Sequence, residues 1–418
     1  MKGTFRSLQN YNYRVWAGGA LISNIGTWMQ RTAQDWLVLV QLTHESATAV
    51  GIVMALQFGP YLLLMPFTGL AADHFDRRRL VMTTQALSGA LALGLGVLTL
   101  TGMVQLWHVY VFAFLFGCVS AFDSTARQTF VAELVGDKHL SNAVALNSTS
   151  FNAARMIGPA VAGVLIAAIG SGWVFVLNAA SFGAVLLSLR WLRLDELRTL
   201  KRSKGTRASL GEGMRYVRSR PDLLAILWMY FLIGTFGLNF PIFISTMSVS
   251  VFHQGPSQYG VLSSCLAVGS VLGALLSASR TNPRLGMLLV GALLFGAGTG
   301  LAALMPGYWW FGLTLTAVGV SAQTFTTTAN STVQLSTDPL MRGRVMAILL
   351  AISVGGTPLG APVVGWVADV CGPRWALGIG AASGLLAAAV AVRYMVRYRG
   401  LRVWIEGRRL RHSLDALS

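Results

Sequence analysis

Long apolar runs alternate with short polar loops along nearly the whole chain. A helix needs about 20 mainly apolar residues to cross the hydrocarbon core of a membrane, and the runs have roughly that length. The pattern therefore predicts an all-α membrane protein with twelve transmembrane helices. The predicted spans cover about residues 13–41, 47–72, 80–100, 106–131, a fifth run after residue 142, then 173–189, 223–250, 259–279, 286–305, 308–336, 344–368 and 375–396.

One long polar stretch interrupts this pattern and divides the predicted helices into two groups of six. Residues 190–222 are rich in Lys and Arg, which is typical of a solvated cytoplasmic linker next to anionic headgroups. The linker separates an amino-terminal six-helix half, 1–189, from a carboxy-terminal six-helix half, 223–396. The tail at 397–418 alternates Arg with apolar residues, which indicates a basic cytoplasmic tail lying as an amphipathic segment on the inner leaflet.

A modest internal repeat supports two related halves. The string at 125–129 resembles the string at 328–332, an offset of 203 residues, and Gly69 and Gly273 are offset by 204. A shared offset is typical of parallel halves that are related by an axis along the membrane normal.

Composition and charge agree with this class and exclude others. Of the 418 residues, 54% are hydrophobic and 11% are charged, too apolar for a soluble globular chain. The net charge of +17 comes from Lys and Arg in alternate loops, and among the intervening loops only Arg374 breaks the rule. This positive-inside pattern predicts a multi-pass protein of the cytoplasmic (inner) membrane with both termini cytoplasmic. The charge therefore implies no nucleic-acid partner.

The residue types that can bind metals or perform covalent catalysis are scattered along the chain. Its three Cys and six His show no ligand or nucleophile spacing, and no acidic cluster accompanies them. We therefore expect no metal, no cofactor and no enzyme activity.

Charged side chains inside the predicted spans are the first candidates for function, because charges at membrane depth usually face a bundle interior or a water-filled cavity. Arg31 and Asp35 lie four residues apart in the first span, Asp123 and Arg127 have the same spacing in the fourth, and Arg155 lies near the middle of the fifth. Residues spaced by four share a helix face and can pair. Asp35 is then either a carboxylate that takes up and releases a proton or half of a permanent ion pair. Asp123 is the second candidate for the carboxylate that takes up the proton.

The carboxy-terminal half is different, because its first four predicted spans contain no acid and instead carry aromatic and amide side chains. We expect the first half to couple protons and the second half to supply much of an apolar substrate surface with a few polar groups. For any single aromatic residue, a place in the core or against lipid is the alternative. The candidate cavity residues from both halves are Gln34, Gln57, Asn152, Phe236, Asn239, Phe240, Gln323 and Asn330.

The loop between the second and third spans resembles a motif of major facilitator superfamily transporters. That motif runs Gly, three residues, Asp, a basic residue, any residue, Gly and two basic residues. Gly69, Asp73, Arg77 and Arg78 match it, whereas His74 and Asp76 replace a basic residue and a Gly. The resemblance implies that the four matching residues form a conformational latch, with Asp73 pairing to a cationic helix end in the outward-open state.

Further strings resemble the branch of drug and siderophore exporters similar to the enterobactin exporter. Gly158, Pro159 and Gly163 partly match the fifth-helix motif of the antiporter branches, although small residues at a helix crossing explain them equally well. The other matching strings lie at 26–30, 36–39, 127–131, 142–147, 154–159 and 342–345.

The resemblance implies a secondary active transporter that exports amphiphilic small molecules, drugs or siderophore-like compounds, by proton antiport and alternating access. Such a protein contributes to multidrug resistance and usually acts as a monomer in contact with membrane lipid. Import coupled to protons, facilitated movement and transport of lipid-like amphiphiles are the alternatives on the same architecture.

Overall fold

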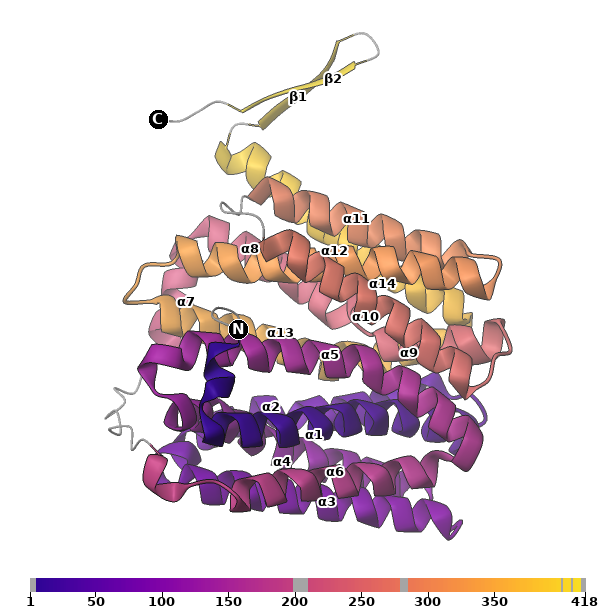
Figure 1. The fold of residues 1–418 in the computed structure, drawn as a ribbon. Helices are drawn as coiled ribbons and strands as arrows, with labels where there is room; N and C mark the ends of the chain where they lie inside the picture. Colours follow the sequence, from indigo (N-terminus) through magenta and orange to yellow (C-terminus); the bar gives the residue numbers. More distant parts are fainter. Residues whose placement is uncertain (1–4, 198–209, 279–284, 400, 407–408, 415–418) are drawn as a thin grey trace.

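The computed structural model describes residues 5–197, 210–278, 285–399, 401–406 and 409–414 (Figure 1). The first half contains η1 (Arg6–Gln9), α1 (Tyr11–Trp36), the π-helical η2 (Leu37–Leu42), α2 (Ala47–His74), α3 (Arg77–Leu100), α4 (Leu106–Val135), α5 (Asp137–Ile169) and α6 (Ser171–Arg190). The short η3 (Leu194–Glu196) and α7 (Leu210–Ser219) follow. The second half contains α8 (Pro221–Leu232), the π-helical η4 (Ile233–Gly237), α9 (Phe240–Thr246), the π-helical η5 (Met247–Val251), α10 (Pro256–Ala278), α11 (Leu285–Leu304), α12 (Tyr308–Ser336), α13 (Arg342–Cys371) and α14 (Pro373–Arg399).

The predicted fold class is confirmed. Ten stretches of the described residues are long and apolar enough to cross a membrane, one of them running from Pro221 to Val251 through α8 and α9. Helices α1 and α12 have comparable length and complete a set of twelve, but they are too polar to meet the same criterion. This polarity has a structural cause, which the cavity described below explains.

Polar side chains set where the first helices begin. The Asn10 side chain accepts a hydrogen bond from the Tyr13 amide at the start of α1, and Ser46 accepts one from Ala49 at the start of α2. Asp76 caps α3 through the Arg79 amide, at 2.7 Å. These N-caps satisfy amides that have no partner within the helix.

The chain folds into two bundles that lie side by side, α1–α6 in one and α8–α14 in the other (Figure 1). They meet where α2 packs on α13 and α5 packs on α10. A Cβ on Gly51 would lie 2.4 Å from the Ala361 carbonyl oxygen, and one on Gly260 would lie 2.4 Å from the Pro159 carbonyl oxygen. Glycine therefore permits a backbone approach that no other residue allows.

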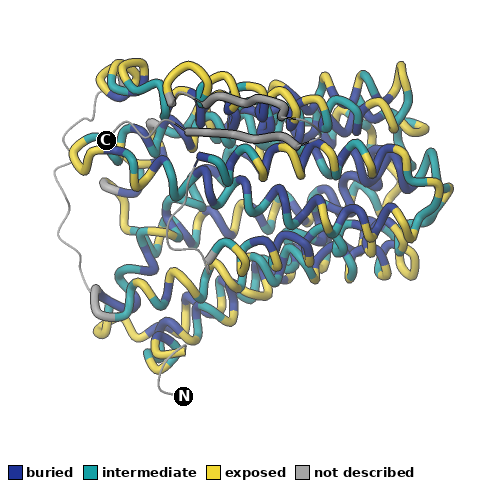
Figure 2. Tube along the Cα trace, turned by 90° about the horizontal axis from the view of Figure 1, so that it is seen from above, coloured by how far each residue is buried: buried dark blue, intermediate teal, exposed yellow. Residues whose placement is uncertain are grey.

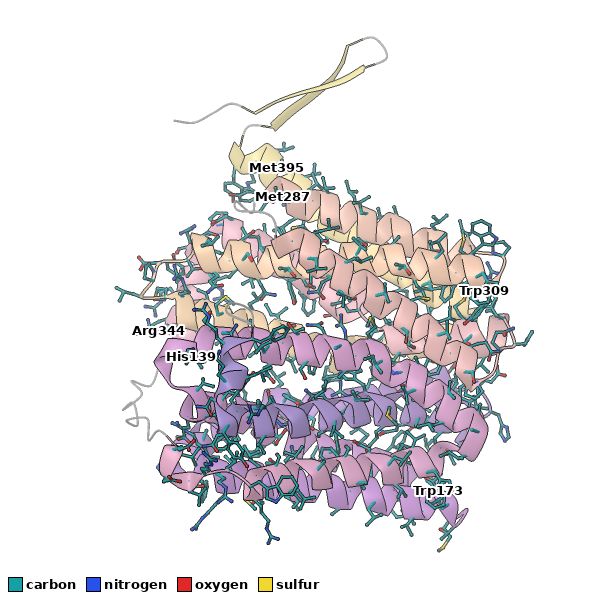
Figure 3. The ribbon with its side chains drawn as sticks, in the orientation of Figure 1. His139, Trp173, Met287, Trp309, Arg344 and Met395 are labelled. Carbon is teal, nitrogen blue, oxygen red and sulfur yellow. The ribbon has the colours of Figure 1, made fainter. Side chains whose placement is uncertain are left out.

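The two ends of the bundle differ in the side chains that they carry, basic at one end and aromatic at the other. Arg344 and His139 lie at the end where α1 begins, and Trp173 and Trp309 lie at the other (Figure 3). We call these the basic end and the opposite end. Figure 2 shows buried positions concentrated inside the bundle, with exposed positions around its outside. Many of the exposed residues are large and apolar, as expected for a lipid-facing surface.

Two parts of the chain differ from the simple picture of a linker and a tail. The predicted linker contains the helix α7, and its residues 198–209 lie outside the described part of the structure. The tail forms two antiparallel strands, β1 (Leu401–Glu406) and β2 (Arg409–Leu414), with Leu401 opposite Leu414. Both strands mix apolar with charged residues, and β1 contains the β-branched and aromatic residues Val403, Trp404 and Ile405, which are enriched in strands. The amphipathic tail is therefore a β-hairpin.

Candidate functional site

A cavity of about 410 Å³ lies between the two halves. The first half lines it with residues of α1, α2 and α5, and the second half lines it with residues of α8 to α10, α12 and α13. Its size is that of a drug-sized ligand site, and most of its lining is apolar.

Some of the polar side chains of α1 and α12 lie in the cavity lining. Helix α1 contributes Arg31 and Asp35, and α12 contributes Gln323, Thr326 and Asn330. A helix that lines a hydrated cavity does not need apolar residues on every face, whereas a lipid-facing helix does. The two helices that are too polar to count as apolar spans, α1 and α12, therefore both line the cavity.

The Asp35 carboxylate joins the two halves. Its Oδ2 accepts a hydrogen bond from the Tyr259 hydroxyl on α10, at 3.3 Å. Asp35 is 8% exposed and Tyr259 is 2% exposed, so the contact is largely shielded from water. The Tyr259 ring also stacks on Trp36, with ring centroids 6.2 Å apart. Sequence reasoning missed Tyr259, because one tyrosine in an apolar run carries no sign of its partner.

Arg31 makes a different contact from the one that its spacing predicts. Among the described residues it forms no ion pair within 4.0 Å of an acid, and Asp35 is not its partner. Its guanidinium lies 5.0 Å from the Trp28 ring centroid and 5.3 Å from that of Phe58. Side chains on an α-helix point toward its N-terminus, so Arg31 reaches Trp28 three residues before it rather than Asp35 four residues after.

Arg155 lies on α5 and also lines the cavity. Within the described residues it has neither a hydrogen bond nor an ion pair. The neighbouring Gly158 faces α1 so closely that a Cβ would lie 2.5 Å from the Trp28 Cβ, and Pro159 lines the cavity. Gly163 faces α10, where a Cβ would lie 2.6 Å from the Pro256 carbonyl oxygen.

Asp123 and Arg127 form the pair that their spacing predicts, but they lie away from the cavity lining. Arg127 Nε lies 2.8 Å from Asp123 Oδ2, without the alignment of a hydrogen bond. The other carboxylate oxygen accepts hydrogen bonds from Thr84 Oγ1 at 2.7 Å and Gln85 Nε2 at 2.8 Å. All four residues belong to α3 and α4 of the first half.

Comparison with known proteins decides the family. A model of the transmembrane secretion effector family, a branch of the major facilitator superfamily, matches residues 2–403. The chain belongs to this family. It is a major facilitator superfamily transporter.

The relatives of this transporter include named exporters. It is 29% identical to the multidrug efflux pump Tap of Mycolicibacterium fortuitum over 84% of this chain and 88% of that protein. It is 26% identical to the enterobactin exporter EntS of Shigella flexneri over 80% of each chain. A bacterial homologue of the human lysosomal transporter Spinster, in an inward-facing and occupied conformation, has the same fold. Its TM-score is 0.73 at 16% identity, over 93% of this chain and 97% of that one.

The loop motif of this transporter contacts its own half. Arg77 Nη1 lies 2.8 Å from Glu133 Oε1 on α4, and Arg78 donates two hydrogen bonds to the Leu189 carbonyl oxygen at the end of α6. Gly69 is exposed, and the Asp73 side chain lies outside the described part of the structure. Asp76, which replaces the Gly of the family pattern, is the N-cap of α3.

The eight predicted cavity residues divide into two groups. Four of them line the cavity: Gln57, Phe240, Gln323 and Asn330. The other four, Gln34, Asn152, Phe236 and Asn239, lie outside the lining. Asn239 is buried at the break between η4 and α9 and donates to the Thr235 carbonyl oxygen. Asn152 donates to the Ser148 carbonyl oxygen one turn earlier on α5. A polar residue within a span can thus satisfy its own helix instead of facing a ligand.

A further set of hydrogen bonds connects the two halves at the opposite end. Asp369, at the end of α13, accepts hydrogen bonds from the amides of Ala47 and Thr48 at 2.7 and 2.9 Å. The Thr48 and Ser46 hydroxyls also donate to it, at 2.5 and 3.2 Å. A carboxylate at a helix N-terminus is favoured both by these free amides and by the helix dipole. Asp369 of one half thus caps α2 of the other.

Proposed function

We propose that this transporter exports amphiphilic small molecules by proton antiport, and that Asp35 is the carboxylate that takes up the proton. The observation that carries the proposal is the hydrogen bond between Asp35 and Tyr259, which connects the two halves inside the cavity. The similarity to Tap and EntS, whose names describe efflux and export, supports the direction of transport.

Protonation of Asp35 would change a contact that spans the halves. An ionised Asp35 accepts the hydrogen bond from the Tyr259 hydroxyl as a charged acceptor, and such bonds are stronger than neutral ones. A neutral carboxyl weakens this bond and lets α1 and α10 separate. The proton is released when Asp35 faces the other side of the membrane. Each cycle therefore moves a proton in one direction and the cargo in the other.

Asp123 is the weaker of the two candidate acids. Its carboxylate already contacts Arg127, Thr84 and Gln85, and all of these belong to the first half. A proton on Asp123 would therefore disturb the packing of one half without changing a contact between the halves. The geometry favours a structural role for this pair and a coupling role for Asp35.

Alternating access follows from the contacts at the opposite end. Gly51 against Ala361, Gly260 against Pro159, and the Asp369 cap hold the halves together there. If both termini are cytoplasmic, as the positive-inside pattern predicts, this end is the outer one, and the proposal is that cargo enters the cavity from the cytoplasmic side. Rocking of the halves would break these contacts and open the cavity outward. One chain contains both halves, so a monomer suffices.

The test is transport by the purified protein in liposomes under an imposed pH gradient, with a panel of dyes and siderophore-like compounds. We expect gradient-driven efflux by the wild type, loss of gradient dependence in Asp35→Asn, and its retention in the control Asp123→Asn. Wild-type rates from Asp35→Asn would refute Asp35 as the coupling site. Movement that ignores the gradient in the wild type would indicate a facilitator, and accumulation driven by the gradient would indicate an importer.

A further inference from the structure

The charges in the cavity are unbalanced. Among the lining residues, Arg31 and Arg155 are cationic and Asp35 is the one acid. The Asp35 carboxylate is already bonded to the Tyr259 hydroxyl in the other half. The neutral hydroxyl leaves the Asp35 charge in place, so the lining carries two positive charges against one negative charge. Among the described residues, neither guanidinium lies within 4.0 Å of an acidic oxygen. Both arginines are half-buried. Charges removed from water are normally paired, so an anionic ligand can supply the negative charge that the lining lacks.

The two arginines occupy successive levels of the cavity. Helices α1 and α5 run in the same direction, and Gly158 on α5 lies level with Trp28 on α1. Arg155 then lies three residues before this contact and Arg31 three residues after it, about 9 Å apart along the helix axes. An anion that enters from the basic end meets Arg155 first and Arg31 next.

The aromatic residues near Arg31 are not free to bind a cation. Trp28 and Phe58 both line the cavity, and the Arg31 guanidinium lies over both rings. These contacts use the π-faces that would otherwise attract a cationic ligand. They also hold the guanidinium in place, while its Nε is buried without a hydrogen-bond partner. An arginine fixed in this way presents a planar set of donors that fits a carboxylate.

We propose that the cavity selects amphiphilic organic anions, with a carboxylate held by Arg31 and Arg155 and an apolar body held by the second half. The inference rests on the proposed transport function and specifies its substrate class. Phe240, Pro241 and Ile244 supply the apolar wall, and a cavity of about 410 Å³ accommodates a drug-sized molecule. Cationic amphiphiles are disfavoured, because they would lie beside two guanidinium groups.

The test is equilibrium binding to the purified protein in phosphatidylcholine nanodiscs, with empty nanodiscs as the blank. Three probes share a naphthalene body: 2-naphthylacetate is an anion, 2-naphthylacetamide is neutral and 2-(2-naphthyl)ethylamine is a cation. We expect the anion to bind at least about tenfold more tightly than either of the others, as a charge-assisted contact with arginine predicts. Equal affinities, or tighter binding of the amine, would overturn the proposal.

Variants separate recognition of the anion from packing. Arg31→Gln and Arg155→Gln should each weaken binding of the acetate about tenfold and leave binding of the acetamide unchanged. The matched control is Arg193→Gln, which alters an exposed arginine that pairs with Glu196 far from the cavity. Equal weakening of the acetate and the acetamide would show that the arginines only support the fold.

Failure of this inference is distinguishable from failure of the proposed function. Binding requires no pH gradient, whereas the proposed function does. Gradient-driven transport together with equal binding of the three probes would overturn the anion class alone. Anion-selective binding without gradient-driven transport would overturn proton antiport and leave the anion class supported.

Discussion

The Tyr259 hydroxyl on α10 donates a hydrogen bond to the Asp35 carboxylate on α1, so a single bond inside the cavity spans the two halves of the transporter. Tyr259 is held in place by stacking on Trp36, and in the described part of the chain no cationic group lies within 4.0 Å of the Asp35 carboxylate. The position of the proton on Asp35 therefore bears directly on whether α1 and α10 stay together.

Replacing Tyr259 by Phe should uncouple transport from the pH gradient. The ring keeps its stacking on Trp36, but the bond to Asp35 is lost. Hydrogen bonds to charged groups contribute about 1.5–3 kcal/mol, which corresponds to a tenfold or greater change in an equilibrium. We expect gradient-driven efflux to fall about tenfold in liposomes while exchange without a gradient persists. Tyr308→Phe removes a hydroxyl that bonds the Gln258 carbonyl oxygen and serves as the control. Unchanged efflux in Tyr259→Phe would contradict the prediction.

Replacing Asp123 by Asn should lower stability rather than coupling. The change leaves the Arg127 charge without its partner inside the first half. Removing one partner of a fully buried pair costs about 3–5 kcal/mol, and the cost is smaller for this half-buried pair. We expect thermal unfolding of the purified protein several degrees below that of the wild type, and partial recovery in the double variant with Arg127→Gln. A variant of unchanged thermal stability that has lost gradient dependence would instead move the coupling site to Asp123.

Replacing Asp369 by Ala should favour separation of the halves at the opposite end. The Ala47 and Thr48 amides lose their acceptor, while Ser46 still caps the Ala49 amide, and loss of an N-cap interaction costs about 0.5–2 kcal/mol. The equilibrium should therefore shift toward the form in which the halves are separated at the opposite end. Spin labels at His44→Cys and at the native Cys371, in a background without Cys118 and Cys265, would report a larger share of long distances. Asp338→Ala, at the basic end, is the control. An unchanged distance distribution in Asp369→Ala would show that the cap does not hold the closed state.

Replacing Gly51 by Val should prevent close packing of α2 on α13. A Cβ at this position would lie 2.4 Å from the Ala361 carbonyl oxygen, which belongs to the backbone and cannot move aside alone. We expect transport to be lost and the same spin-label pair to report separated ends. The matched control is Gly59→Val on the same helix, where no atom lies within 4 Å of the added Cβ. Equal loss of transport in both variants would point to a general effect on α2.

The apolar runs were enough to predict the helices and their division into two halves. The run at 286–305, for example, coincides within one residue with α11 (Leu285–Leu304). The charged residues within spans were also informative, since Arg31, Asp35 and Arg155 all line the cavity. The positions of charged residues within spans therefore indicated part of the cavity lining, although Asp123 and Arg127 lie outside it.

The side chains that meet across the cavity could not be predicted from the sequence. Periodicity assigns residues to a helix face, but the rotation of each helix depends on neighbours far away in the chain. Gln34 and Gln57 carry the same side chain in adjacent spans, yet Gln57 lines the cavity and Gln34 is buried outside the lining. The Arg31 contact with Trp28 depends on the direction of the side chain, which spacing by four does not contain.

The polarity of α1 also bears on how the protein is made. Helix α1 is synthesised before α2, and its Arg31 and Asp35 both disfavour insertion into a bilayer, where one charged residue costs up to about 2.5–3.5 kcal/mol at the centre of a span. Helix α2 is apolar enough to span alone and follows after residues 43–46 only. Helix α1 is therefore expected to enter the bilayer together with α2 as a hairpin, and later to be retained by α5 and α6. The residues that give the mature protein its cavity thus make its biogenesis cooperative from the first helix onward.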